Sequence, residues 1–427
     1  EARNLISTYG EGVWTGFGDI LPPYAVQTGE VTYLIGGENP PDGFHKDDPE
    51  AGLYVKEGSL LRGPVATSLS IGGEFTVVIS ARDRLEEYAN SFAHVENFNL
   101  SRAEYVQALV HEGFHAYQLS TLGGVEGIPS FGFTGDPSAV QEDLRGSENW
   151  DARISRAGRA LSRASSTEGL PAKRKVLREY FRVIDEGSGI GLEAQAFEAQ
   201  TQWVEGTARY AGTMTVLEAN RDGRRGPVDY EPAEEVLSGL LDQLSSELSG
   251  PTPVRDKLAA MGAVKGLALD GLFPGWKQAL FREKVGLDDL LRSAVEVPEP
   301  LEDFPVTGVW LAGEFLTVGL ADNRSRWSQG LQHVSSLGFL DGMVFLFPEP
   351  VRSGFWMKDT EIALQIGFFS KVGRLVESVV MEPCRSDDCP VHVPEEPFRF
   401  VLELPTDSYF QLEEMSRSLL EISGDLT

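Results

Sequence analysis

The residues of this chain that could most clearly do chemistry are His111, Glu112 and His115, within the sequence HEGFH. A spacing of four places the two imidazoles one helical turn apart on one helix face, where both can bind the same zinc ion. Glu112 stands between them and is expected to lean toward the open coordination position, where it can accept a proton from a water molecule that zinc activates. The alternative is a pair of surface or core histidines on an ordinary helix.

A zinc site needs a third protein ligand, and the segment WVEGTARY at residues 203–210 offers one. It resembles the WLxEGxAxY pattern of the gluzincin peptidases, which include the peptidase-MA group and the large aminopeptidases. The resemblance covers roughly residues 10–295 and extends to uncharacterised bacterial proteins of the same type. It implies that Glu205 is the third zinc ligand, that Zn2+ is the cofactor, and that a peptide or protein is the substrate.

The long separation between His115 and Glu205 departs from the aminopeptidases and is expected to hold an inserted helical hairpin. The small residues Gly206 and Ala208 beside the ligand are expected to let the two metal-bearing helices approach closely.

Further side chains could support the site. Glu198, two helical turns before Glu205, could hold a zinc-binding imidazole or could be a solvated carboxylate. Arg209, one turn after Glu205, could orient that carboxylate or could be exposed. Peptide hydrolysis also needs a donor for the developing oxyanion, and Tyr180 and Tyr230 are the candidates.

The sequence predicts an α+β fold. Strands are expected within residues 24–28, 31–37, 52–58 and 74–80, and the last could be an edge strand that pairs with substrate or an internal strand. From Ser101 the periodicity becomes helical, and SRAE forms a capping box in which Ser101 and Glu104 satisfy each other's backbone amides. Helices are then expected over 148–164, 171–186 and 192–219, with four shorter ones between 233 and 295.

Residues 296–308, EVPEPLEDFPVTG, carry three prolines and four carboxylates and are expected to be a linker. The predicted domains are therefore a zincin-like domain at 1–295, with a β-rich beginning and a mostly helical remainder, and a small, mostly β domain at 309–427.

The C-terminal part is similar to the domain-of-unknown-function-192 family. Counterparts of its GLM-x-R, DGMLFxF, FWMKNTxIPLDxxF, PC…C and RYVLEL signatures lie at 330–333, 341–347, 355–360, 383–389 and 399–404. The resemblance implies a small, mostly β fold and no settled activity. Asp359, Ala363 and Gln365 replace the family's Asn, Pro and Asp, which puts any binding by its polar cluster in doubt.

Within that match, Phe355, Trp356 and Met357 are expected to be core residues rather than a ligand site. A role of this domain in docking a partner, capturing substrate or attaching to a surface stays open.

The only cysteines, Cys384 and Cys389, are close together and predict a small disulfide loop; the alternative is a metal site with His392. With a start at Glu1, the disulfide favours a secreted, periplasmic or cell-surface protein.

The net charge of −28 argues against nucleic acid and anionic membrane surfaces as partners. No apolar run is long enough to span a membrane.

The leading hypothesis is a zinc metallopeptidase with Glu112 as general base, of unspecified endo- or exo-type. The second is a non-enzymatic surface or assembly protein that retains a zincin fold, against which the presence of Glu112 argues. A third is a different zinc hydrolase, since HExxH specifies water activation better than the bond that is cleaved.

Overall fold

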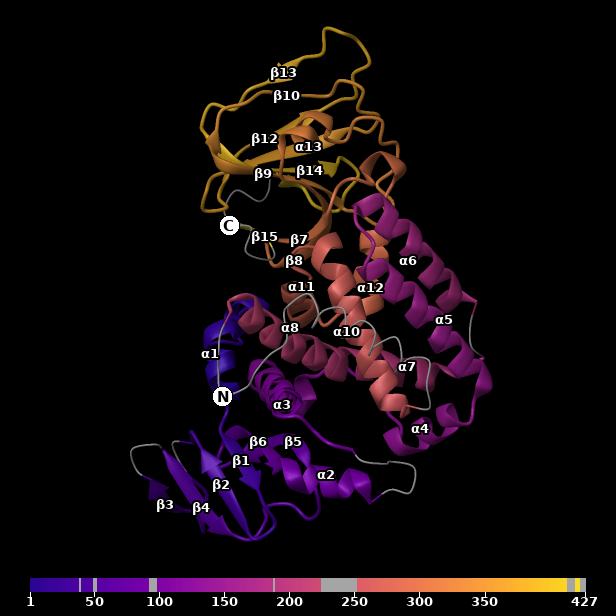
Figure 1. The fold of residues 1–427 in the computed structure, drawn as a ribbon. Helices are drawn as coiled ribbons and strands as arrows, with labels where there is room; N and C mark the ends of the chain where they lie inside the picture. Colours follow the sequence, from indigo (N-terminus) through magenta and orange to yellow (C-terminus); the bar gives the residue numbers. More distant parts are fainter. Residues whose placement is uncertain are drawn as a thin grey trace. The chain divides into compact units, whose positions relative to one another are not determined.

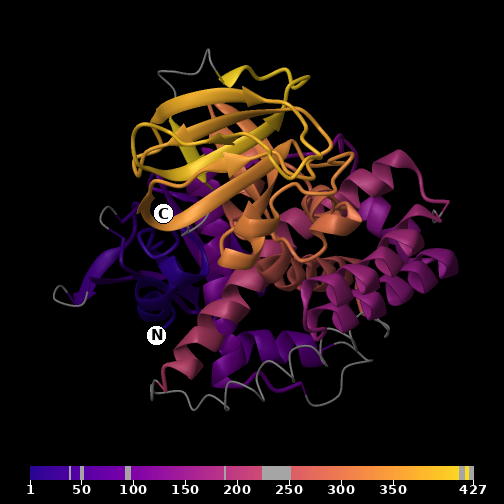
Figure 2. The same ribbon diagram turned by 90° about the horizontal axis from the view of Figure 1, so that it is seen from above.

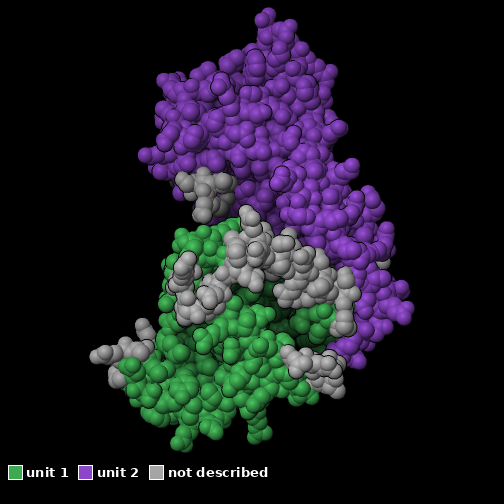
Figure 3. All heavy atoms as spheres, viewed as in Figure 1, with its two compact units in different colours: residues 1–141, 196–263 green, residues 142–195, 264–427 purple. Residues whose placement is uncertain are grey.

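The computed structural model describes residues 1–37, 40–48, 52–91, 98–186, 189–223, 252–412 and 419–422. The chain forms two compact units (Figure 3). Unit 1 comprises Glu1–Gln141 and Ala196–Ala263, and unit 2 comprises Glu142–Gln195 and Val264–Thr427. Helices and strands occur in both units, which confirms the α+β prediction. Among the described residues no helix is both long and apolar enough to cross a membrane.

A six-stranded sheet lies at the N-terminal end of unit 1 (Figure 1). Its strands are β1 (Tyr24–Gln27), β2 (Val31–Ile35), β3 (His45–Asp48), β4 (Leu53–Glu57), β5 (Ala66–Ile71) and β6 (Glu74–Ser80), in the order β3-β4-β2-β1-β6-β5. β6 pairs with β1 in a parallel orientation and with β5 in an antiparallel orientation. The internal alternative for residues 74–80 is therefore the correct one, because the edge strand beside β6 is β5.

The helices expected from Ser101 and over 148–164, 171–186 and 192–219 are present. The helices of the described residues are α1 (Ala2–Val13), α2 (Arg82–Asn90), α3 (Arg102–Leu122), α4 (Pro137–Arg145), α5 (Glu148–Ser165), α6 (Leu170–Asp185), α7 (Leu192–Thr201), α8 (Thr207–Arg221), α10 (Val254–Leu272), α11 (Trp276–Glu283), α12 (Leu287–Val295) and α13 (Arg324–Gln329), with short 3-10 turns η1 (Val125–Gly127) and η3 (Glu299–Leu301). Four of these helices were not expected: α1, α2, α4 and α13. A single π turn, η2 (Gln202–Gly206), joins α7 to α8. Residues 224–251, where a further short helix was expected, lie outside the described residues.

Helix α3 is fixed at both ends by the chemistry that the sequence indicates. Ser101 Oγ accepts from the Glu104 amide at 3.1 Å, and Glu104 Oε2 accepts from the Ser101 amide at 2.8 Å, which confirms the capping box. The helix ends at Gly123, whose φ of 76° is the left-handed conformation that glycine adopts without steric cost.

Unit 2 combines helices with a seven-stranded sheet of order β12-β11-β14-β9-β8-β7-β15. The strands are β7 (Val306–Leu311), β8 (Glu314–Ala321), β9 (Gly342–Val351), β11 (Leu364–Phe369), β12 (Leu375–Met381), β14 (Phe398–Pro405) and β15 (Leu420–Ile422), and β10 (Phe355–Trp356) pairs separately with β13 (Val391–His392). Helices α5 and α6 lie side by side, as Figures 1 and 2 both show. One sheet face packs on an apolar core that includes Val344, Phe400 and Leu402.

The segment 296–308 is not an open linker, and the two compact units do not divide there. Leu301 and Phe304 are buried in unit 2, and part of the segment forms η3. The fully buried guanidinium of Arg174 on α6 donates to the carbonyls of Leu301, Glu302 and Phe304, and also to that of Ala294. The composition of this segment predicted a solvent-exposed linker. The segment is part of the core instead, because the buried Arg174 side chain donates hydrogen bonds to several of its backbone carbonyls.

Candidate metal centre

His111 and His115 lie on the same face of α3, as their spacing predicts. Their Nε2 atoms are 3.1 Å apart, and their rings are almost perpendicular, with an interplanar angle of 88°. Both imidazoles are largely buried, at 23% and 13% side-chain exposure. At this distance the two ring nitrogens can share one cation or one proton.

Glu205 reaches the same point from the π turn η2. Its Oε2 atom lies 3.7 Å from His111 Nε2 and 3.5 Å from His115 Nε2. Metal–ligand distances of about 2.0–2.1 Å in a tetrahedron give ligand–ligand edges of roughly 3.3–3.4 Å, so all three separations fit one zinc ion. In the part of the chain that the structure describes, these three residues form the one group of at least three potential ligands with this convergence.

The π turn is a feature that the sequence did not reveal. Single π turns within α-helices are uncommon and are often found at functional sites. Because η2 holds an extra residue in its turn, the spacing of seven between Glu198 and Glu205 does not return to the same helix face as a regular α-helix would. The geometric argument for Glu198 beside the zinc-binding imidazoles is therefore lost, although Glu198 is a buried carboxylate on α7.

Gln118 determines which ring nitrogen of His115 carries the proton and which keeps its lone pair. The Gln118 Nε2 group donates to the Val204 carbonyl at 3.1 Å and to Thr207 Oγ1 at 2.9 Å, so the amide oxygen must be the atom 2.7 Å from His115 Nδ1. An oxygen acceptor there requires a proton on Nδ1 and leaves the lone pair on Nε2, directed to the metal centre. This residue was missed in the sequence, although it lies three positions after His115.

Arg255 on α10 is a second partner that the sequence did not indicate. It donates to Glu205 Oε1 at 2.6 Å, so the other carboxylate oxygen is the one that faces the histidines. Burial alone would raise the pKa of Glu205, but contacts with His111 and His115 and the charge of Arg255 hold it well below its usual range. The carboxylate is therefore ionised, as a metal ligand must be.

Glu112 lies on α3 between the two histidines in sequence, and its charge acts on His115. Its side chain is buried, and Oε2 has no hydrogen-bond partner among the described groups. A buried carboxylate oxygen without a partner is costly and is a sign of a missing ligand or water. The Glu112 carbonyl accepts from Ser68 Oγ at 2.8 Å, which attaches the edge strand β5 to the helix at this residue.

Glycines allow the helices of the centre to meet, but not in the pairing expected from the sequence. A Cβ atom at position 206 would lie 2.5 Å from the Cα of Gly262, so Gly206 admits α10 rather than α3. The close approach to α3 occurs at Gly212, where a Cβ would lie 3.3 Å from the His111 amide nitrogen. Ala208 is fully buried beside them.

Of the two expected oxyanion donors, Tyr180 lies within the described residues and Tyr230 does not. Tyr180 is fully buried in unit 2, where its hydroxyl donates to Asp288 Oδ1 at 2.6 Å, so the expectation for Tyr180 is wrong. Arg209 is half-buried on α8, and Arg255 is a hydrogen-bond partner of the Glu205 carboxylate.

A cavity of about 330 Å³ adjoins the centre within unit 1. Glu205 and Arg255 contribute to its lining. Apolar side chains such as Val125, Phe197 and Val204 and the polar side chains of Gln141, Gln200 and Thr201 form the rest. The site therefore combines a cluster of potential metal ligands, a buried carboxylate and an adjoining recess.

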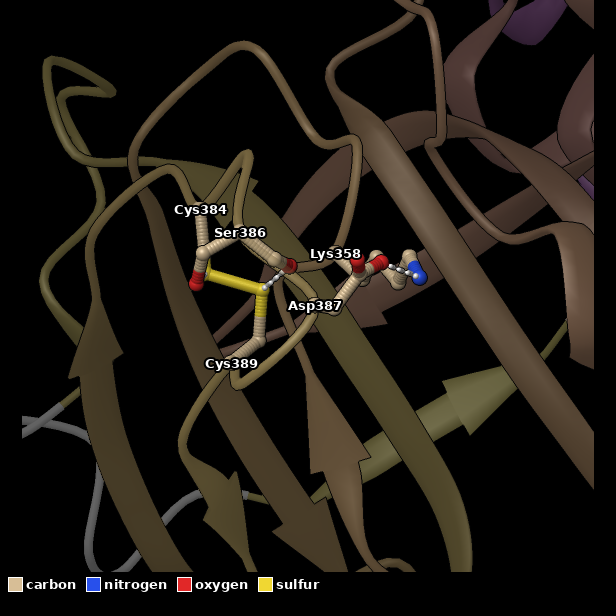
Figure 4. The surroundings of a disulfide bond; sticks show 5 residues. All are labelled: Lys358, Cys384, Ser386, Asp387 and Cys389. Carbon is tan, nitrogen blue, oxygen red and sulfur yellow. Dashed lines mark hydrogen bonds and ion pairs between the residues drawn. A yellow bond between two sulfur atoms is a disulfide. The ribbon is translucent and has the colours of Figure 1, made fainter.

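In unit 2, Cys384 and Cys389 form a disulfide bond, as the sequence predicts (Figure 4). Its loop is attached to the preceding strand region by an ion pair of 2.9 Å between Lys358 and Asp387. Because both sulfurs are in the bond, the alternative metal site with His392 is excluded.

The seven-stranded sheet of unit 2 carries the segments that are similar to the domain-of-unknown-function-192 family. Its strands β9, β11 and β14 carry the DGM, IALQ and RFVLEL segments side by side. Residues 309–413 are a DUF192 domain, a family described as uncharacterized ACR. No curated protein matches this chain.

Two solved structures are similar to part of the chain. One is a proposed transcription regulator from Sinorhizobium meliloti 1021, with 28% identity over 28% of this chain and 96% of that one and a TM-score of 0.26. The other is a protein of unknown function from Novosphingobium aromaticivorans DSM 12444, with 23% identity over 28% of this chain and 84% of that one and a TM-score of 0.24.

Proposed function

We propose that this chain is a zinc-dependent metallopeptidase whose centre lies in unit 1. The observation that carries the proposal is the convergence of His111, His115 and Glu205 around one point, with the unpartnered carboxylate of Glu112 next to the histidines. The residues fit zinc, because two imidazoles and one carboxylate are a common catalytic set for this ion. When bound, zinc would act as a Lewis acid that polarises a carbonyl and increases the acidity of water.

The residues of the chain would perform the proton transfers. Glu112, buried and free of competing hydrogen bonds, would accept the proton of the attacking water and deliver it to the leaving amine. Gln118 would keep His115 in the tautomer that binds metal, and Arg255 would hold one oxygen of Glu205 so that the other faces the histidines.

The surroundings suit an extended peptide. The edge strand β5 is attached to the Glu112 backbone through Ser68 and offers unpaired backbone groups to a substrate strand. The recess beside Glu205 includes apolar side chains such as Val125, Phe197 and Val204 and would accept an apolar side chain of the substrate. The disulfide is consistent with a proposed location outside the reducing cytoplasm.

The experiment combines metal analysis with a peptide-library digest. We expect one zinc per chain and cleavage that a chelator abolishes. Glu112→Gln should retain zinc and lose activity by roughly 10²–10⁴-fold, because the amide cannot accept the proton. Glu126→Gln, an exposed carboxylate on η1, is the matched control and should retain full activity.

Two results would contradict the proposal. Equal cleavage by zinc-loaded wild type and Glu112→Gln would remove HEGFH from catalysis. Zinc binding without cleavage of any peptide would favour the non-enzymatic alternative, a surface or assembly protein that retains the zincin site.

A further inference from the structure

The DUF192 domain contains a cavity of about 330 Å³ that is separate from the zinc-binding cluster. It lies on the face of the seven-stranded sheet opposite the apolar core, where α13 covers β9 and β14. Aromatic side chains form much of its wall: Trp327, Phe345, Phe347, Phe355 and Trp356. Trp327 stacks on Phe347 with ring centroids 4.8 Å apart, and Phe345 meets Phe355 edge to face at 5.3 Å.

A carboxyl group also lines this cavity. Along β14, Phe400, Leu402 and Leu404 point into the apolar core, so the alternation of the strand directs Glu403 to the cavity. Glu403 is only 6% exposed, and its side chain makes no hydrogen bond or ion pair with any described residue. Burial raises the pKa of Glu403 to about 8. A carboxyl placed in an aromatic cavity without a partner is costly for folding and indicates a ligand.

The remaining polar or charged side chains of the wall are Arg324, Ser328, Gln329, Gln332, Ser353 and Thr360. Gln329 donates its amide group to the Pro300 carbonyl, and Gln332 donates to the Ser328 carbonyl at 3.0 Å. Their amide oxygens accept from no described residue and can each accept a hydrogen bond. Arg324, an exposed residue of α13, is the one other charged residue among the described lining groups.

We propose that this cavity binds a primary alkylammonium group, with Glu403 as its counter-ion and the aromatic side chains around its alkyl part. The faces of tryptophan and phenylalanine rings attract cations, and an ammonium carries three donors for the carboxylate and amide oxygens. An anion would be repelled by Glu403 once it ionises. A neutral sugar would leave ionised Glu403 without a counter-ion, and Gln329 and Gln332 already donate their amide groups to backbone carbonyls.

The expectation that Phe355, Trp356 and Met357 are core residues is thus only partly met. Met357 is buried, whereas Trp356 is 49% exposed at the cavity. Trp356 therefore provides a fluorescence signal for ligand entry. The inference does not depend on the peptidase proposal, since no residue of the zinc-binding cluster contributes to this cavity.

The test titrates the full-length protein with n-butylammonium and with 1-butanol, its neutral counterpart of equal size, by calorimetry and tryptophan fluorescence. We expect n-butylammonium to bind at least tenfold more tightly. Binding near pH 7 should release close to one proton, because the cation favours ionised Glu403. A blocked tripeptide with central lysine distinguishes the source: tighter binding than n-butylammonium indicates a lysine side chain, and weaker binding a free amine.

Glu403→Gln keeps the shape of the side chain and should weaken n-butylammonium at least tenfold without changing the affinity for 1-butanol. Glu396→Gln, an exposed carboxylate of the same domain, should bind as wild type does. Equal binding of amine and alcohol, unchanged affinity in Glu403→Gln, or no binding of n-butylammonium at about 10 mM and pH 9 would each overturn the proposal.

Discussion

The amide oxygen of Gln118 lies 2.7 Å from His115 Nδ1, while its amide nitrogen donates to Val204 and Thr207 next to Glu205. One side chain thus connects the helix that carries the histidines to the π turn that carries the carboxylate. The geometry of the metal centre therefore depends on a residue that would not itself bind the metal.

Replacement of Gln118 tests this connection. Gln118→Ala should lower zinc affinity by roughly 10–100-fold, because His115 loses the partner that fixes its tautomer and ring orientation. The measurement is competition with a chromophoric chelator. Gln107→Ala is the matched control: Gln107 also joins α3 to α8, through Thr213 at 2.9 Å, but contacts no proposed ligand. Equal zinc affinity in the two variants would contradict the assigned role.

Arg255 is expected to contribute to catalysis as well as to orientation. Its guanidinium uses one nitrogen on Glu205 and has further donors that could stabilise an oxyanion. Arg255→Ala should lower zinc affinity by roughly 10-fold, as the loss of a ligand's partner does, and should lower kcat of the zinc-saturated variant by about 10²-fold or more. Arg221→Ala, which removes an exposed arginine on α8, is the control. If zinc affinity falls as far as kcat, Arg255 only orients Glu205.

Gly206 is expected to tolerate no side chain. A Cβ there would lie 2.5 Å from Gly262 Cα and 2.9 Å from its carbonyl carbon, so α10 would have to move. Gly206→Ala should reduce the free energy of unfolding by about 1–3 kcal/mol and weaken zinc binding. Gly12→Ala, in α1 with no neighbour within 4 Å of the new methyl group, should be neutral or slightly stabilising. Urea unfolding of both variants measures the difference, and equal stabilities would refute the steric argument.

Stability should depend on pH through Glu403. Its pKa of about 8 in the folded protein is above the ordinary value of 4.5, so the unfolded chain releases this proton first as pH rises. Its ionisation in the unfolded state therefore lowers stability progressively between about pH 4.5 and pH 8, by about 1.4 kcal/mol for each pKa unit. Glu403→Gln should exceed wild type in stability at pH 8 by a few kcal/mol, and the advantage should shrink toward pH 5. An advantage that does not change with pH would show that Glu403 keeps its ordinary pKa.

The segment 296–308 is expected to resist proteases, contrary to its linker-like composition. Arg174→Ala should leave several buried carbonyls without donors, cost more than about 3 kcal/mol, and expose this segment to cleavage. Limited proteolysis with mass spectrometry locates the cuts. Arg163→Ala, which removes only an exposed ion pair with Glu179, should leave the digestion pattern unchanged. Early cleavage of wild type within 296–308 would restore the linker interpretation.

The sequence by itself determined the features that depend on local periodicity. HEGFH within a capped helix placed two imidazoles on one face, because residues four apart on an α-helix are neighbours whatever surrounds them. The short spacing of Cys384 and Cys389 likewise sufficed for the disulfide. Alternation of apolar residues located most strands of the DUF192 domain.

Only the tertiary structure decided which distant groups meet. Gln118 and Arg255 became partners of the centre through the packing of α3, η2 and α10, which no local pattern encodes. The π turn changed the face on which Glu205 lies relative to Glu198, because one extra residue in a turn shifts every later side chain. The hydrogen bonds of Arg174 make a proline-rich segment part of the core of unit 2. Alternation along β14 places Glu403 on the opposite sheet face from its apolar neighbours, but only the packing of other elements on that face makes its surroundings an aromatic cavity.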